Sequence, residues 1–429
     1  MNTFLAKITT IYKDPTLRRR IVFTIVALIV FRLLAAIPVP GINTASLSSL
    51  IANNQLFGLL DLFSGGGISR LSIVMLGVGP YITASIIIQL LTMMVPSLKN
   101  MMHDEGEAGR AKLSQYSRVL SVPLAMLQAL GFILLLESPA YNIIPHLGSS
   151  ALILNVIVAT AGSVLLMWIG ELISEFGVGN GVSLIIFAGI IARLPGQLPQ
   201  LLAQFQTAGA ANVPLYILAL VIAVIVIGAV VFITEAERSV PVTYAKQVRG
   251  NKVYGGVSTY LPLRLNQAGV IPIIFALSIL IVPATIANFF ISNANTTIAS
   301  VATTIVGLLN PSGWTYGLAY FILVFLFTYF YTAVTFDPQQ ISENLQKSGA
   351  FIPGVRPGDS TMQYLARVVT RITLVGALFL GVIAILPLIM QGFTGGTSFA
   401  IGGTALLIVV SVVIDLIKKV DAQIAMREY

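Results

Sequence analysis

The side chains of this 429-residue chain that could do chemistry are few and scattered. There is no cysteine, so the chain has no thiolate nucleophile, no disulfide and no cysteine-ligated metal. The two histidines, His103 and His146, fall in separate loops and do not form a ligand pair. Motifs of metalloproteases (H-E-x-x-H), hydrolases (G-x-S-x-G) and phosphate-binding loops (G-x-x-x-x-G-K-[ST]) are missing. The sequence therefore predicts no enzyme, no catalytic residue, no metal and no cofactor.

These few groups belong to a chain dominated by apolar residues. Hydrophobic residues make up 56% and charged residues 9%, with a mean hydropathy of +0.92, whereas about a quarter of an ordinary soluble domain is charged. Uncharged runs of roughly 18 to 25 residues recur along the whole length, as bilayer-spanning helices require. This composition excludes a water-soluble globule and predicts an all-α polytopic membrane protein.

Apolar runs bounded by charged residues, proline and glycine predict ten membrane-spanning helices. The predicted spans cover residues 21–37, 72–95, 117–136, 151–172, 181–195, 214–233, 267–289, 314–336, 367–389 and 399–417. An even number of spans places both termini on the same side of the membrane.

Lysine and arginine are distributed unevenly between the two sides that this count defines. Of the 24, 21 fall on the side of the termini: five in the N-terminal arm, four after the second span, five after the sixth, four after the eighth and three in the tail. Because positive charge accumulates on the cytoplasmic side, both termini are predicted to be cytoplasmic. The connection from Glu171 to Asn180 is an exception with two acids and no base, which the rule tolerates because acidic residues count for little.

Ionisable residues inside the spans are equally sparse. Arg32 is the only plain example, while Arg193 and Asp415 lie close to span ends, where side chains can reach polar surroundings. A proton- or sodium-coupled carrier usually places carboxylates near the membrane midplane. The predicted spans offer none there, which argues against a coupled carrier.

Two cytoplasmic segments carry patterns of their own. Residues 240–244 and 253–260 are rich in valine, threonine and tyrosine, and the stretch 249–252 between them reads as a turn, so we expect a hairpin with a basic tip. Around Arg356, glycine and proline recur too often for a helix, which predicts a stiff loop carrying that arginine.

An interrupted apolar segment follows the first span. Residues 56–95 contain Asp61, three consecutive glycines and Arg70, and are too long for one span but too short for two. We expect residues 56–64 to form a half-helix on the non-cytoplasmic side that breaks at Gly65–Gly67 before a full span begins. Non-helical backbone at membrane depth needs a covering of protein or a water-filled cavity. An interfacial helix on the outer surface is an equally good reading of these residues.

Several short motifs are spread along essentially the whole chain. They are Phe63-Ser64-Gly65-Gly66, 80–91 (PYITASIIIQLL), Glu105-Gly106-Glu107 with Gly109-Arg110, 177–181 (GVGNG), 268–272 (AGVIP), 347–358 (KSGAFIPGVRPG) and Gly402-Gly403-Thr404. Together they resemble the SecY family of protein-conducting channels.

The resemblance implies two pseudo-symmetric halves of five helices, an hourglass pore between them, a re-entrant plug half-helix and a lateral gate that opens to lipid. It assigns an aliphatic pore ring to Val78, Ile82, Val182, Ile186, Ile274 and Ile408. It assigns the plug to Leu60, Asp61, Phe63, Ser64, Gly65, Gly66 and Gly67, and the lateral gate to Thr83, Ile86 and Val282.

The resemblance also implies partners. Lys246, Arg249, Lys252 and Arg356 would dock ribosomal RNA or the motor ATPase SecA, which would supply the driving energy. Relatives often place two bases directly after the hairpin glycine, whereas here Gly250 is followed by Asn251 and then Lys252, so which base makes the contact stays open. Further expected partners are the SecE and SecG subunits, signal-bearing precursor polypeptides and membrane lipid, at the bacterial cytoplasmic membrane.

The predicted function is thus a channel that translocates unfolded secretory polypeptides and releases transmembrane segments sideways into the membrane. A small-solute secondary transporter with an inverted repeat is the alternative, and an intramembrane hydrolase lacks a nucleophile constellation. A carrier would show carboxylates and unwound helix ends at the midplane, a channel an aliphatic waist with a plug. The predicted organisation is an arm (1–20), an N-terminal half (21–195, plug about 56–70), an external hinge loop (196–213), a C-terminal half (214–417, cytoplasmic loops about 234–266 and 337–366) and a cytoplasmic tail (418–429).

Overall fold

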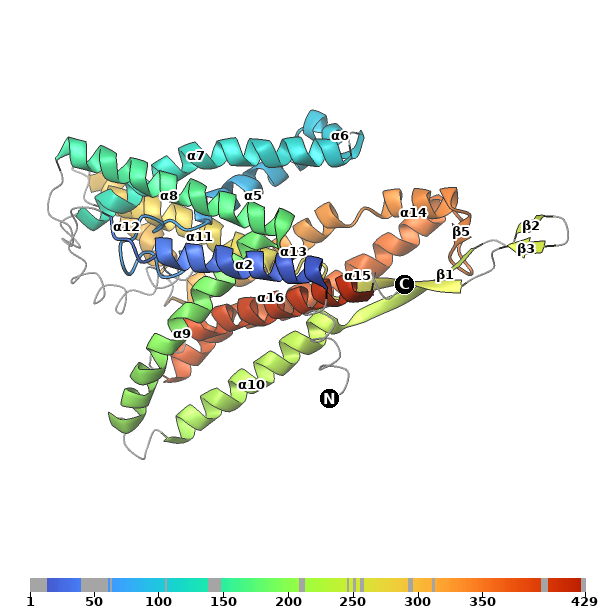
Figure 1. Cartoon of the computed structure of the whole chain (residues 1–429). Helices are drawn as coiled ribbons and strands as arrows, with labels where there is room; N and C mark the ends of the chain where they lie inside the picture. The colour runs from blue at the N-terminus through green and yellow to red at the C-terminus, as the bar shows by residue number, and fades with distance from the viewer. Residues whose placement is uncertain are drawn as a thin grey trace.

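Helices dominate the computed structural model of the chain (Figure 1). The structure describes residues 14–39, 61, 64–104, 106–137, 148–207, 213–244, 247–249, 252–254, 258–291, 296–310, 313–394 and 400–425. Its helices are α2 (Pro15–Leu34), α5 (Gly79–Met94), α6 (Pro96–Asp104), α7 (Glu107–Glu137), α8 (Ser149–Phe176), α9 (Gly181–Thr207), α10 (Val213–Glu235), α11 (Ile271–Phe290), α12 (Thr296–Leu308), α13 (Trp314–Thr335), α14 (Pro338–Lys347), α15 (Asp359–Thr394) and α16 (Ala400–Ala425).

Each predicted span overlaps one of these helices, so the prediction of a helical architecture is confirmed. Among the described residues, four stretches are long and apolar enough in composition to cross a bilayer: Glu107–Glu137, Ser149–Phe176, Trp314–Lys347 and Asp359–Leu386. Other apolar helices, such as Gly79–Met94 and Ile271–Leu280, are shorter.

The predicted start of the second span was wrong. A helix was expected from residue 72, but residues 64–78 form turns and α5 begins at Gly79. Gly77 adopts a φ of 58°, which a helix does not allow, and Pro80 then occupies the first turn, where its missing N–H costs nothing.

Helical structure also extends beyond the predicted spans. Helix α9 continues to Thr207, so most of the segment 196–213 that was predicted as an external loop is helical. Helices α6, α12 and α14 lie in segments for which no helix was predicted. Each is short, from 9 to 13 residues, and so falls below the length that identifies a span.

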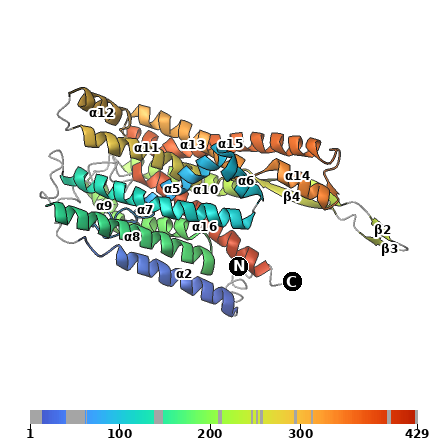
Figure 2. The same ribbon diagram turned by 90° about the horizontal axis from the view of Figure 1, so that it is seen from above.

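One end of the helix bundle gathers segments from the whole length of the chain. Leu17 near the start of α2, Val178 between α8 and α9, and Ile424 near the end of α16 pack in one cluster. Lys418 of α16 also forms an ion pair of 3.0 Å with Glu235, the last residue of α10. We call this the basic end, because the sequence analysis placed the basic arm, tail and hairpin here. Figure 2 shows α2 and α16 reaching it together.

A small antiparallel sheet projects from the basic end. Strand β1 (Glu237–Tyr244) pairs with β4 (Ser258–Arg264) and β5 (Ala350–Phe351), and beyond them β2 (Gln247–Arg249) pairs with β3 (Lys252–Tyr254). Buried Val240 and Val242 of β1 pack against Leu365 and Val369 of α15, which anchors the sheet to the bundle. The predicted hairpin is confirmed, and it is the projection at the right of Figure 1.

The outer surface of the bundle is apolar. On α2, Ile29 is 53% and Leu33 64% exposed, and on α10 Phe232 is 73% exposed. A soluble protein seldom leaves contiguous apolar patches of this kind uncovered. Hydrocarbon solvates such side chains without cost, so this surface suits a lipid environment.

The turns at residues 64–78 pack closely against α8 through a glycine. A Cβ added at Gly162 of α8 would lie 1.9 Å from the carbonyl oxygen of Ile73. The neighbouring Ser163 hydroxyl donates a hydrogen bond of 2.9 Å to the carbonyl oxygen of Gly77. Helix α8 therefore supports the turns by direct backbone contact, which requires glycine at position 162.

Replacing that glycine should destabilise the protein. Gly162→Ala forces backbone apart, and we expect a loss of roughly 1–3 kcal/mol in unfolding free energy, as in other overpacked cores. The melting temperature of the purified protein in detergent measures the effect. Gly228→Ala on α10 is the matched control, because nothing lies within 4 Å of a Cβ there. Equal melting temperatures for the two variants would contradict the packing argument.

Candidate functional site

An extended group of buried apolar side chains joins helices from distant parts of the chain. It draws residues from α2, α5, α8, α9, α10, α11, α13, α15 and α16, together with Val74 and Val78 of the turns before α5. We call it the apolar cluster. Residues before and after position 196 both contribute to it.

The cluster brings together the six residues predicted to form a ring. Val78, Ile82, Ile186, Ile274 and Ile408 are all buried in it, and Val182 is partly buried against it. Val182 and Ile186 are four residues apart on α9, which puts both on one helix face, and Val78 at the N-cap of α5 precedes Ile82 by the same spacing. An aliphatic constriction offers no hydrogen bonds to water or ions and can close by dewetting. The role of these residues in a pore stays a prediction.

A polar cavity of about 510 Å³ adjoins four of the six ring residues. Its lining comprises Tyr81, Ile82, Ser85, Gln89, Ser114, Arg118, Glu171, Ser174, Glu175, Asn180, Val182, Ser183, Ile186, Ile271, Ile274, Phe275 and Tyr331. Arg118 of α7 forms an ion pair with Glu171 of α8 in this wall. Asn180 is close in sequence to Val178 of the basic end, so the cavity lies on that side of the apolar cluster.

The predicted plug segment is described in part. Leu60, Phe63 and the rest of the proposed half-helix before Asp61 lie outside the described residues. Asp61 is fully buried, and so are Ser64, Gly65 and Gly67. Gly65 and Gly66 have φ values of 69° and 84°, so the backbone at these glycines is not helical, as the expected break requires. The half-helix before them stays a prediction.

A serine hydroxyl satisfies the backbone at this break. The Ser64 Oγ atom accepts hydrogen bonds from the N–H groups of Gly67 and Ile68, at 3.0 and 3.1 Å. The N–H of Gly66 donates to the carbonyl oxygen of Asp61 at 2.9 Å. Backbone groups that leave the helix are thereby hydrogen-bonded inside the protein.

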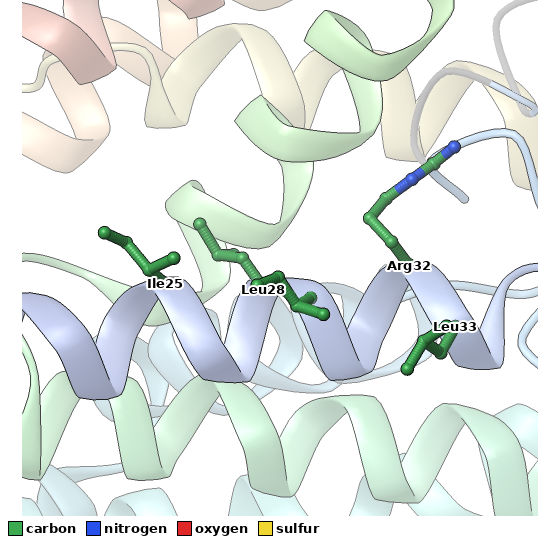
Figure 3. A pocket seen from close by; sticks show the side chains of 5 residues that line it. Ile25, Leu28, Arg32 and Leu33 are labelled. Atoms are coloured by element: carbon green, nitrogen blue, oxygen red, sulfur yellow. The ribbon is translucent and has the colours of Figure 1, made fainter.

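Two arginines hold the same turn from neighbouring helices. Arg32 of α2 donates a hydrogen bond of 2.8 Å from Nη1 to the carbonyl oxygen of Gly65, and Figure 3 shows its side chain leaving α2 toward that segment. The Nη2 atom of Arg193 on α9 lies 3.0 Å from Oδ2 of Asp61. Within the described part of the chain, Oδ2 of Asp61 has no well-aligned hydrogen bond, so its contact with Arg193 is an ion pair. The sequence marked both arginines only as ionisable groups in or near apolar runs.

The turn also meets α9 through backbone. A Cβ added at Gly189 of α9 would lie 2.4 Å from the Cα atom of Gly65, and one added at Gly65 would lie 2.5 Å from Phe31. Two facing glycines therefore allow the turn to lie directly on α9.

The predicted lateral-gate residues lie on two helices that contact each other, α5 and α11. Ile86 of α5 is buried in the apolar cluster, and Thr83 is half-buried, its hydroxyl donating to the carbonyl oxygen of Gly79 at 3.1 Å. Val282 belongs to α11, but its side chain lies outside the described residues.

The predicted docking bases lie on projecting segments. Arg356 is exposed between β5 and α15, and the flanking Gly354 and Gly358 have φ values of 81° and 95°. Arg249 and Lys252 pair at the hairpin tip, though their side chains, like the whole of Lys246, are outside the described residues. Within the described part of the chain no group of three His, Cys, Asp or Glu side chains could hold a metal ion.

Comparison with known proteins decides the family. A family model described as SecY matches residues 72–417. The chain belongs to the SecY family. It is 43% identical over 432 residues to the protein translocase subunit SecY of Thermotoga maritima, covering 97% of this chain and 95% of that protein. It is 41% identical over 446 residues to the same subunit of Mycobacterium bovis, covering 100% and 99%. Membership of this family, with its apolar helices, makes the chain a multi-pass membrane protein.

Solved structures show the same fold at low sequence identity. A structure described as a protein-conducting channel matches with a TM-score of 0.66 at 19% identity, covering 96% of this chain and 93% of that one. Sec61 from a canine ribosome–channel complex of the endoplasmic reticulum matches with a TM-score of 0.63 at 18% identity, covering 96% and 93%.

The seating of the turn on α9 can be tested without assuming a function. Ser64 is buried, and the chain has no cysteine, so Ser64→Cys introduces one protected thiol. Gly189→Ala should lift the turn from α9 and speed labelling of that thiol by a polar maleimide by roughly tenfold or more, since backbone must separate. Gly196→Ala on the same helix, where a Cβ meets nothing within 4 Å, should leave the rate unchanged. Equal rates in the two backgrounds would show that the glycine contact does not hold the turn.

Proposed function

We propose that this chain is a protein-conducting channel, which translocates unfolded secretory polypeptides across the membrane and releases transmembrane segments laterally into it. One observation carries the proposal: six aliphatic side chains from α5, α9, α11, α16 and the turn before α5 meet in one buried cluster. Family membership supports it, because the matched relatives are protein translocase subunits.

The chemistry of the cluster suits a passage for polypeptide. Aliphatic side chains can change rotamer to fit around an extended polypeptide, and they form no hydrogen bonds with it. When the passage is empty, the same surface loses water and becomes a barrier to ions. In this proposal the plug segment, about residues 56–70, closes the resting passage on the non-cytoplasmic side.

The basic end would face the cytoplasm of a bacterium, with both termini on that side. The proposed architecture has ten spans in two pseudo-symmetric halves, and the hinge between them would follow α9. The polar cavity then becomes the cytoplasmic vestibule, because it adjoins the ring on the side of the basic end. An incoming chain would meet polar walls first and the aliphatic ring second.

The lateral gate is proposed between α5 and α11. A signal sequence is an apolar helix, and transfer of each buried CH₂ group from water into lipid is favourable by about 0.8 kcal/mol. A seam that opens sideways therefore lets such a helix leave the passage by hydrophobic transfer alone.

Partners are proposed from the exposed surfaces. Arg356, with Lys246, Arg249 and Lys252 of the hairpin, would contact the ribosome or the SecA motor, since projecting bases attract phosphate and acidic surfaces. A groove of about 440 Å³ on α2, lined by Ile25, Leu28, Ile29, Arg32 and Leu33, offers an apolar face for a small membrane subunit such as SecE or SecG (Figure 3). Two solved structures of the same fold support the first contact: Sec61 in the canine ribosome–channel complex and the yeast Ssh1 complex bound to the ribosome.

The transporter alternative is less well supported. A coupled carrier needs a carboxylate that can exchange its ion or proton. Asp61 is buried, but Arg193 lies beside it and the N–H of Ser69 donates to it at 2.8 Å. These contacts fix the Asp61 carboxylate in the turn, so it is poorly placed to exchange an ion or a proton with a solute.

The lateral gate can be tested by stapling it shut. The chain has no cysteine, so Thr83→Cys with Val282→Cys introduces a single pair across α5 and α11. If the Cα atoms lie within roughly 4.4–6.8 Å, oxidation forms a disulfide. Transport of a signal-bearing precursor should then fall nearly to zero and recover on reduction, because a signal helix cannot leave through a closed seam. If a gel shows that the disulfide has formed completely and transport is undiminished, the proposed gate is wrong. A longer bifunctional crosslink is the control and should permit transport.

Docking can be tested separately from folding. Arg356→Glu reverses the charge of an exposed side chain, so the amount of protein in the membrane and its melting temperature should not change. Motor-driven transport should fall by at least roughly tenfold, because repulsion replaces a charge contact. Arg367→Glu, at an exposed position on α15, is the matched control. Failure of Arg356→Glu to accumulate would mean that the residue is structural.

A further inference from the structure

Helix α9 carries two kinds of contact on a single face. Val182 and Ile186 lie at the apolar cluster, while Gly189 and Arg193 lie at the turn that contains Asp61. Their spacing of four, three and four residues keeps all of them within one helical stripe. The proposed ring and the proposed plug therefore share a single rigid support.

The charge contact at the far end of this stripe is buried on one side. The Asp61 side chain is fully buried and that of Arg193 is 20% exposed, with 3.0 Å between Oδ2 and Nη2. Asp61 Oδ1 accepts the Ser69 N–H at 2.8 Å and the Ser64 hydroxyl at 3.4 Å. A buried carboxylate that loses its cationic neighbour is strongly disfavoured, so the turn gains most from staying where Arg193 is.

The stem of Arg193 also touches the turn. A Cβ on Gly66 would lie 4.0 Å from Arg193 Cγ, so the aliphatic part of the Arg193 side chain lies next to this glycine. Arg32 contributes differently, because it binds the carbonyl oxygen of Gly65 and not a charge. Arg193 is thus the described residue that joins α9 to the turn by charge.

We propose that Arg193 is a positioning residue for the plug: through Asp61 it latches the turn onto α9, and displacement of α9 by an entering polypeptide releases it. This inference rests on the proposed channel function. Movement of Val182 and Ile186 outward to admit a chain moves Gly189 and Arg193 with them, since they belong to one helix. The ring then opens the plug without a separate signal.

The test measures resting ion conductance of the purified protein in planar bilayers. Arg193→Gln and Asp61→Asn should each raise it by on the order of tenfold or more, because either change breaks the charge contact. The double variant should conduct no more than either single variant, since both remove the same contact. Arg193→Lys keeps a cation and should restore part of the seal.

Two controls separate the latch from the plug itself. Arg70→Gln removes an exposed positive charge from the same segment and should leave conductance near that of the parent. Deletion of residues 61–67 should raise conductance if the segment is a plug at all. No rise after the deletion would overturn the plug and the latch together. A rise after the deletion but none in Arg193→Gln would overturn the latch alone, and additive effects in the double variant would do the same. A lower melting temperature in Arg193→Gln with unchanged conductance would assign the residue a structural role only.

Discussion

Backbone that leaves the helix inside a membrane must find its hydrogen bonds and its covering within the protein, and this constraint organises the structure. Residues 64–78 are turns, and other parts of the chain satisfy them. Val39 N–H donates to Leu71, Ile73 N–H donates to the carbonyl oxygen of Ile37, and Ser163 donates to Gly77. Helices α2, α8 and α9 must therefore lie against these turns, and glycines in α8 and α9 let them approach to backbone distance.

The same arrangement produces the candidate site. The turns before α5 place Val78 at the N-cap of this helix, so Ile82 lies one helical turn further on, inside the apolar cluster. Helix α9 then brings Val182 and Ile186 to that cluster and Arg193 to Asp61. A polar cavity on the side of the basic end and a buried turn against α9 leave the aliphatic cluster between them. An aliphatic barrier does not select among the side chains of the passing polypeptide, so it suits a channel that transports polypeptides of many sequences.

The sequence could predict the long apolar helices, the hairpin and the non-helical backbone at the glycines, because each depends on a local pattern: long apolar runs, β-branched residues around a turn, and three consecutive glycines. It could not predict α6, α12 and α14, which are too short to show as spans. It could not predict where α5 begins, since Leu71 with a φ of 44° and the hydrogen bonds of the turns are tertiary effects. The Asp61–Arg193 contact joins residues far apart in sequence, so no spacing rule indicates it. The ring residues became candidates only by resemblance, because valine and isoleucine carry no signal of their own in such a chain.

The central claim is that polypeptide passes through the apolar cluster. Site-specific photocrosslinking tests it most directly, with a photoreactive residue in place of Ile186 or Ile408 in the cluster, or of the outward-facing Leu154 of α8. A precursor arrested during transport should crosslink from Ile186 and Ile408 and not from Leu154. Crosslinks from Leu154 with none from the two cluster positions would place the passage elsewhere and contradict the account.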